Sequence, residues 1–366
     1  MIEPLPAGGT APASTTVCVG FLDDDHVLDM ARRLLTARSD RDWADLAGFF
    51  APEVPDPSVL RSLRAGVGPA DGVTVASSPA DCTVLLLRRG RVDRRLLESS
   101  PRLRFVQRLG ARDDGIDLVA AREHGVQVSC LPRPSLERTA EHALLLMLAL
   151  VKRLPTADRA VRAGRTAGRP GDVAYNWAGL TGLGGLTGRT LGIIGLGEVG
   201  LLVAERARAF GMRLLYCGAT RPPAERQTEL GARHLPIGDV LAGADIVSLH
   251  APGATAGEPL IGRAEIDAMR PGALLINTSR GRLVDEDALY DALAAGRLGG
   301  AGLDVHRAEP RPADDRFCAL DNVVLTPHIA GGSRLDVLDE VGQIFDNIRS
   351  VRSGGSPVHG RVEVGS

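Results

Sequence analysis

Short apolar runs alternate with amphipathic stretches in the first part of the chain. Apolar and β-branched residues dominate positions 16–22, 82–87 and 105–109, and these runs predict strands. The spacing of apolar residues predicts helices over 25–37 and 92–99. Residues 141–154 are apolar on nearly every side, which predicts a helix buried between layers. This alternation indicates an α/β domain with a parallel sheet.

The pattern becomes more regular after residue 190. Apolar runs predict strands at 191–194, 213–217, 246–249, 273–277, 300–305 and 323–326, with helices in most intervals. Six strands joined by helical crossovers indicate a doubly wound nucleotide-binding sheet. Residues 163–189 are rich in Gly and Arg, which predicts a surface loop. The amphipathic pattern over 331–353 predicts a last helix that returns to the first domain.

Composition narrows the classes of function. The 366 residues carry a net charge of -2 and 3% aromatic residues, which argues against a nucleic-acid partner. The longest apolar run, 142–152, is too short to cross a membrane, and residues 1–15 predict a disordered extension rather than a signal peptide. Five scattered cysteines without a CxxC pair argue against disulfides and metal sites and favour the cytoplasm. Lys152 is the one lysine, so a single arginine is weak evidence of function.

A glycine-rich turn gives the first chemical signal. Gly195, Gly197 and Gly200 follow an apolar strand and precede a predicted helix over 198–210. In a dinucleotide-binding unit such glycines allow a tight turn, close approach of the backbone to the pyrophosphate, and close packing of the helix on the sheet. The turn therefore predicts an NAD(P)(H) site. Its contacts are expected to include Leu196, Glu198 and Val199 as well as the glycines.

The end of the second strand bears on the choice of dinucleotide. In NAD-binding units an acidic residue here binds the adenine-ribose 2′-hydroxyl, but residues 216–221 contain no carboxylate. Cys217 and Gly218 end the strand, and Arg221 follows. A cation at this point accepts the 2′-phosphate of NADP, which favours NADP(H) over NAD(H). The alternative is that Arg221 is one more surface arginine.

Polar residues follow three later strands. Arg280 follows the strand at 273–277, Glu309 lies beyond the strand at 300–305, and His328 follows the strand at 323–326. Because ligands of open α/β sheets bind at the carboxyl ends of strands, we expect these side chains to converge near the nicotinamide. The other histidines are expected to be structural, and His306 to lie on the surface.

Together these ordered motifs resemble the D-isomer-specific 2-hydroxyacid dehydrogenase family over residues 82–348. The shared segments are 106–117, 140–142, 195–200, 250–252, 277–281, 304–310 and 326–332. The resemblance implies two doubly wound α/β domains with the cleft between them: a Rossmann cofactor domain over 154–328 and a discontinuous flavodoxin-like substrate domain over 16–153 and 329–366. It also implies a homodimer joined through the cofactor domains.

The resemblance assigns roles to individual residues. Arg280 is expected to bind the substrate carboxylate with its planar guanidinium. His328 is expected to exchange a proton with the 2-oxo oxygen while hydride moves between nicotinamide C4 and substrate C2, and Glu309 to orient His328. Further cofactor contacts are expected from Thr139, His250, Ala251, Pro252, Thr278, Ser279 and Asp304, and substrate contacts from Arg89, Gly90 and Ala111.

The substrate loop departs from the family pattern. Arg112 replaces the second glycine of a Gly-x-Gly turn that begins at Gly110, and Asp113 replaces an aromatic residue. One hypothesis is that Arg112 binds a second anionic group of the substrate, such as a phosphate, phosphonate or distal carboxylate. The alternative is an outward arginine in a salt bridge with Asp113 or Asp114.

These observations favour an NAD(P)-dependent oxidoreductase acting on a small D-2-hydroxy or 2-oxo acid. Two alternatives stay open at this point. The same fold can act on a phosphite- or phosphonate-type substrate, and it also occurs in dinucleotide-sensing corepressors or scaffolds. Turnover of 2-oxo acids with NADH or NADPH separates the enzyme from the sensor.

Overall fold

The computed structural model describes residues 16–69, 72–165, 180–219, 221–252 and 258–363. The chain divides into two compact units. The first contains Met1–Arg133 and Ser333–Ser366, and the second contains Pro134–Gly332. The predicted extension at 1–15 and the middle of the predicted loop at 163–189 lie outside the described residues.

The first unit contains, within the described ranges, a parallel five-stranded sheet in the order β2-β1-β3-β4-β5. Its strands are β1 (Val17–Phe21), β2 (Val73–Val75), β3 (Val84–Leu87), β4 (Phe105–Leu109) and β5 (Gln127–Leu131). This order is the flavodoxin-like one. Every residue of β3 and β4 is buried, as expected for parallel strands that are covered on both faces.

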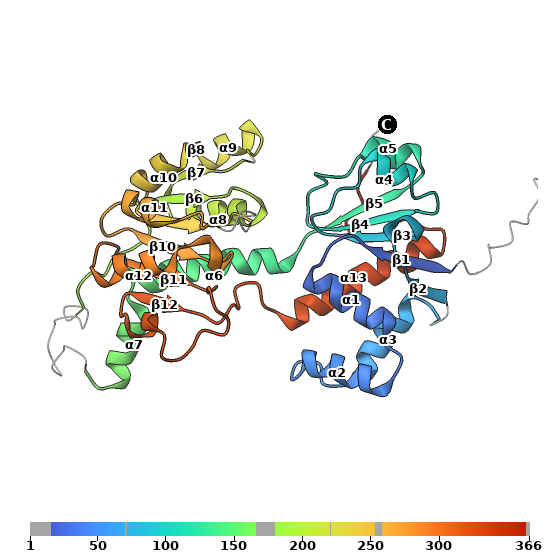
Figure 1. Cartoon of the computed structure of the whole chain (residues 1–366), viewed down its shortest axis with the longest axis horizontal. Helices are drawn as coiled ribbons and strands as arrows, with labels where there is room; N and C mark the ends of the chain where they lie inside the picture. Colours follow the sequence, from blue (N-terminus) through green and yellow to red (C-terminus); the bar gives the residue numbers. More distant parts are fainter. Residues whose placement is uncertain (1–15, 70–71, 166–179, 220, 253–257, 364–366) are drawn as a thin grey trace, which may run out of the picture. The chain divides into compact units, whose positions relative to one another are not determined.

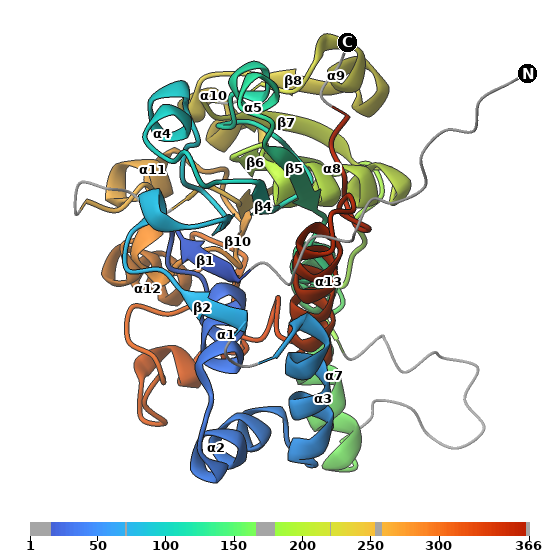
Figure 2. The same ribbon diagram turned by 90° about the vertical axis from the view of Figure 1, so that its right-hand side faces the viewer.

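Helices from both ends of the sequence cover this sheet. They are α1 (His26–Thr36), α2 (Asp40–Phe50), α3 (Pro57–Val67), α4 (Arg94–Glu98), α5 (Leu118–Glu123) and α13 (Arg334–Arg352). The C-terminal helix α13 packs beside α1 (Figure 1) and along α3 (Figure 2). Its buried side chains Val341, Ile344 and Ile348 belong to the same core cluster as β1. The last helix therefore completes the first unit.

The second unit contains a parallel seven-stranded sheet among its described residues, in the order β12-β11-β10-β9-β6-β7-β8. Its strands are β6 (Thr190–Ile194), β7 (Arg213–Cys217), β8 (Ala232–His234), β9 (Ile246–Leu249), β10 (Leu274–Asn277), β11 (Gly300–Leu303) and β12 (Val323–Leu325). Counted from β6, the order is that of a Rossmann sheet with one added strand. The predicted fold class, two doubly wound parallel-sheet units, is confirmed.

The helices of the second unit are α6 (Pro134–Val151), α7 (Leu154–Arg162), α8 (Glu198–Ala209), α9 (Ala224–Leu230), α10 (Ile237–Gly243), α11 (Arg263–Ala268) and α12 (Glu286–Ala294). The unit boundaries differ from the predicted ones at 153/154 and 328/329. Helix α6 belongs to the second unit, because its buried residues Ala143, Leu146 and Met147 pack in one cluster with β6 and α8. None of the described helices is both long and apolar enough to cross a membrane.

Candidate functional site

The carboxyl end of β6 runs into the N-terminus of α8 through the predicted glycine turn. Gly195 has a φ of +98°, a conformation that glycine adopts without strain. A Cβ at Gly200 would overlap the carbonyl oxygen of Gly195, so neither position accepts a side chain. Gly197 is the N-cap residue of α8, and a Cβ there would meet no heavy atom within 4 Å.

This turn fits the pyrophosphate of a dinucleotide. The space before Gly197 is open, and the first N–H groups of α8 have no partner within the helix and attract an anion. Leu196 is 1% exposed and anchors the turn in the core, so only its backbone can serve a ligand. Glu198 and Val199 are half-buried at the start of α8.

Two buried polar atoms near the same sheet edge support a bound ligand. Nδ1 of His250 and Oγ1 of Thr278 are shielded from solvent and lack a hydrogen-bond partner in the described structure. Buried polar groups are normally paired, so both atoms suit the polar groups of a cofactor. Nε2 of His250 lies 2.8 Å from Oγ of Ser248, and burial lowers the pKa of His250 to about 4. Ala251 is half-buried and Pro252 exposed, directly after His250.

The end of β7 lies against the glycine turn. A Cβ at Gly218 would lie 3.4 Å from Cα of Gly195, so the two turns are adjacent. Cys217 is buried, while Gly218 and Arg221 are exposed. Gln227 holds the segment that follows: its amide donates to the carbonyl of Pro222 at 2.8 Å and accepts from the Tyr216 hydroxyl at 2.8 Å.

His328 and Glu309 meet beyond the ends of β12 and β11. Nδ1 of His328 lies 2.8 Å from Oε2 of Glu309, and the N–H of His306 donates to Oε1 at 2.9 Å. Burial raises the pKa of Glu309, but the hydrogen bonds from His328 and His306 outweigh it, so that the pKa lies below its usual value. A carboxylate on Nδ1 leaves Nε2 of His328 for a substrate.

Asp304 holds the turn that presents His328. His328 has a φ of +56°, and its N–H donates to the carbonyl of Asp304 at 2.8 Å. The buried Asp304 carboxylate accepts from the Thr326 hydroxyl at 2.7 Å and from the N–H groups of Ile329 and Ala330, both at 2.9 Å. We expected Asp304 to contact the nicotinamide. Both of its carboxylate oxygens accept hydrogen bonds within this turn, and the contact with the nicotinamide stays a prediction.

Arg280 lies exposed at the same edge, after β10. Asn277 shapes its turn by donating to the carbonyl of Arg280 at 2.9 Å and accepting from the N–H of Ser279 at 3.0 Å. A Cβ at Gly281 would overlap the backbone of His306, so the loops after β10 and β11 are in contact. The second unit therefore gathers the segments that carry Arg280, Glu309 and His328 at one edge of its sheet.

Comparisons with known proteins agree with this geometry. The model of the D-isomer specific 2-hydroxyacid dehydrogenase NAD binding domain matches residues 144–330. A glyoxylate reductase of Korarchaeum cryptofilum is 38% identical over 278 residues, which are 76% of this chain and 82% of that protein. The chain belongs to the D-isomer-specific 2-hydroxyacid dehydrogenase family.

Further relatives of this dehydrogenase include a D-3-phosphoglycerate dehydrogenase of Archaeoglobus fulgidus, 35% identical over 285 residues, 77% of this chain and 51% of that protein. The crystal structure of a glyoxylate reductase from Paecilomyes thermophila is 27% identical, with a TM-score of 0.56 over 95% of this chain and 98% of that one. The chain is thus an oxidoreductase of hydroxy and oxo acids that uses a nicotinamide cofactor. The phosphite-type substrate and the sensing scaffold are not favoured.

Four of the expected substrate residues lie in the first unit of the dehydrogenase, namely Arg89, Gly90, Ala111 and Arg112, whereas Arg280 lies in the second. One oxygen of Asp23 accepts the N–H groups of Arg88, Arg89 and Gly90, at 2.6, 2.8 and 3.0 Å. The backbone of this loop is therefore engaged by an internal carboxylate, which sequence reasoning did not foresee.

Arg112 forms a salt bridge of the kind that the alternative names. Its Nη2 lies 2.8 Å from Asp114, which also pairs with Arg108 at 3.0 Å. Ala111 is exposed beside it. In the second unit, the hydroxyl of Thr139 donates to the carbonyl of Ser135 at 2.7 Å.

The prediction that His306 lies on the surface was wrong. The residue is 7% exposed, and its ring is held between Arg311 and the carbonyl of Thr326. The burial could not be read from the sequence, because Arg311 is itself held by Glu286 of helix α12, which is distant along the chain.

Proposed function

We propose that the dehydrogenase interconverts a small 2-oxo acid of the glyoxylate or hydroxypyruvate type and its D-2-hydroxy acid. The observation that carries the proposal is the 2.8 Å contact between His328 Nδ1 and Glu309 Oε2 at the carboxyl edge of the Rossmann sheet. Relatives named glyoxylate reductase and glyoxylate/hydroxypyruvate reductase B support the substrate class.

Each residue of this site has a defined task in the proposal. A nicotinamide cofactor supplies or accepts the hydride when it is bound. His328 donates a proton from Nε2 to the 2-oxo oxygen during reduction and takes it back from the hydroxyl during oxidation. Glu309 accepts from Nδ1–H, which orients the ring and stabilises the imidazolium. Arg280 binds the substrate carboxylate through its guanidinium fork.

Steady-state kinetics test this assignment. Purified protein is assayed with NADH and NADPH against glyoxylate, hydroxypyruvate and pyruvate. We expect turnover, and a loss of about 10² to 10⁴ in kcat for His328→Asn. The exposed His124 provides a matched control, since His124→Asn removes a histidine from the other unit and should leave kcat unchanged. The proposal is contradicted if no combination of cofactor and 2-oxo acid gives turnover, or if His328→Asn is fully active.

We propose further that NADP(H) is preferred over NAD(H). Three residues at the β7 end, Cys217, Gly218 and Ala219, carry no negative charge, and the exposed Arg221 follows them. Fluorescence titration should give a lower Kd for NADPH than for NADH, and Arg221→Ser should remove most of the difference. A tenfold preference for NADH refutes the proposal.

We also propose that the protein is a cytoplasmic homodimer joined through its cofactor-binding unit, as the family resemblance implies. All five cysteines are free thiols, in keeping with a reducing compartment. Light scattering of the purified protein tests the assembly, and a monomer at micromolar concentration overturns it.

A further inference from the structure

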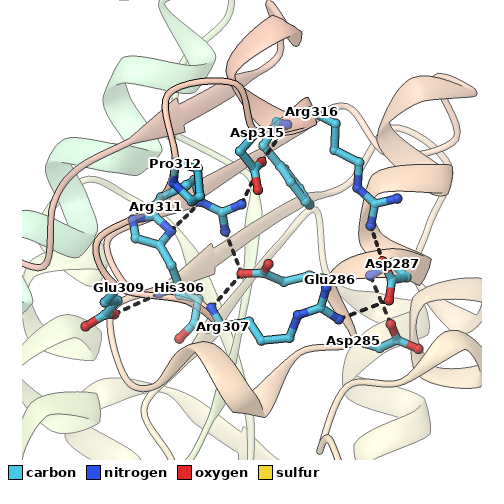
Figure 3. A network of polar contacts seen from close by, with 12 residues as sticks. Asp285, Glu286, Asp287, His306, Arg307, Glu309, Arg311, Pro312, Asp315 and Arg316 are labelled. Carbon is cyan, nitrogen blue, oxygen red and sulfur yellow. Dashed lines mark hydrogen bonds and ion pairs between the residues drawn. The ribbon is translucent and has the colours of Figure 1, made fainter.

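A buried ionic network lies in the loop after β11, beside Glu309 (Figure 3). The Arg311 side chain is 8% exposed. Its Nη2 donates to Glu286 at 2.6 Å, its Nη1 pairs with Asp315 at 2.8 Å, and its guanidinium carbon lies 4.9 Å from the ring centre of Phe317. Its Nε donates to Nδ1 of His306 at 3.0 Å. These contacts use different parts of the guanidinium, so its orientation is fixed.

Arg311 determines where the proton of His306 lies. A guanidinium offers only donors and stays protonated, so Nδ1 of His306 must accept and carries no proton. Nε2 of the same ring lies 2.9 Å from the carbonyl oxygen of Thr326, which can only accept. His306 is therefore the neutral Nε2–H tautomer. A second proton on Nδ1 would face the N–H of Arg311.

His306 contacts both segments that bring the proton-transfer pair together. Its backbone N–H donates to Oε1 of Glu309, whose other oxygen meets His328. Its ring N–H donates to the carbonyl of Thr326, two residues before His328. One residue thus aims the Glu309 carboxylate and also ties the Glu309 loop to the strand end that presents His328.

We propose that His306 and Arg311 are positioning residues for this pair: Arg311 fixes the tautomer of His306, and His306 sets the geometry between Glu309 and His328. This inference rests on the proposed roles of Glu309 and His328. The side chains of Arg311 and His306 form no hydrogen bond with the side chain of Glu309 or His328 in the described structure, so both would act through the geometry of the loop.

Two substitutions separate positioning from stability. Arg311→Lys places a methylene where Nε stands, so it removes the donor to His306 but keeps a cation for the buried Glu286. His306→Phe keeps a ring and the backbone N–H but loses both ring nitrogens. Arg316→Gln is the matched control, because Arg316 lies on the same loop, pairs with Asp287 and stacks on Tyr290.

The variants are compared by urea unfolding, by kcat and KM, and by ¹⁵N NMR of histidine-labelled protein, with His306 assigned from the His306→Phe spectrum. In the wild type we expect His306 to show an unprotonated Nδ1 and a protonated Nε2. Arg311→Lys should lose this signature. It should also lower kcat by about 10-fold to 100-fold, the scale of a small misplacement of reacting groups, with KM within twofold.

His306→Phe should lower kcat similarly, and the double variant should fall no further, because both changes break one chain of contacts. Arg316→Gln should change neither kcat nor the spectrum. A wild-type His306 that is doubly protonated, or unchanged kcat in both folded variants, overturns the inference. If Glu309→Gln is fully active, the proposed function itself fails; if only Arg311→Lys and His306→Phe are fully active, the proposed function stands without this inference.

Discussion

Mild acid should destabilise the second unit through His250. Burial lowers the pKa of His250 from 6.5 to about 4 in the folded chain. Between these values the unfolded chain binds a proton that the folded chain does not, so stability rises with pH in this window. The full difference of 2.5 pH units corresponds to about 3 kcal/mol, at about 1.4 kcal/mol for each unit. Between pH 7.5 and 5, His250 should contribute a loss of about 2 kcal/mol.

The assay is urea unfolding followed by circular dichroism at several pH values and constant ionic strength. Carboxylates titrate in the same range, so the decisive quantity is the difference between the wild type and His250→Gln, which keeps a polar group near Ser248. The wild type should lose about 2 kcal/mol more than the variant between pH 7.5 and 5. The control is His124→Gln at an exposed position, which should lose as much unfolding free energy between pH 7.5 and 5 as the wild type. Parallel curves for wild type and His250→Gln, or an NMR titration of His250 near pH 6.5, refute the reasoning.

Three further changes test the site. Gly197→Ala should leave the melting temperature nearly unchanged but weaken dinucleotide binding at least about tenfold in a fluorescence titration, since its Cβ enters the open space before α8. Gly200→Ala should lower the melting temperature, because its Cβ overlaps the carbonyl of Gly195. Glu309→Gln should lower kcat by about 10² or more with KM little changed. Burial raises the pKa of Cys82 to about 11, so iodoacetamide at pH 8 should label the exposed Cys318 and spare Cys82, as mass spectrometry of the digested protein can show.

Buried parallel strands were the predictable part of the fold. The strands 105–109, 213–217 and 246–249 occur as predicted, because strands covered on both faces are continuous apolar runs. Strands β2 and β8, which have three residues each, were not predicted. Strand β5 was not predicted either, because Gln127 and Ser129 interrupt its apolar pattern.

Those two polar residues are explained only by distant parts of the chain. Gln127 donates to the carbonyl of Gly355, and Ser129 donates to that of His359. Asn347 on α13 closes the same network with a hydrogen bond to Gln107 at 2.7 Å. A strand whose buried polar groups are satisfied by the C-terminal segment cannot be predicted from its own pattern.

The candidate site divides in the same way. Arg280, Glu309 and His328 could be predicted because each follows a strand whose carboxyl end faces the ligand edge of the sheet. The residues that shape the site could not. The hydrogen bonds of Asp304 to the turn at 326–330, for example, depend on how that turn folds back over β11.

Nearly every cation of this chain is an arginine, so charge alone does not distinguish their roles. The burial of the carboxylate that each arginine pairs with does. Arg311 pairs with Glu286, whose side chain is 8% exposed, and a substrate anion that took this arginine would leave a buried carboxylate unpaired. Arg112 pairs with Asp114, whose side chain is 56% exposed, so water can solvate the released carboxylate. An anionic substrate can therefore compete for Arg112 at far smaller free-energy cost than for Arg311. Binding of a dicarboxylic 2-oxo acid should weaken on Arg112→Ala, and Asp114→Asn should strengthen it.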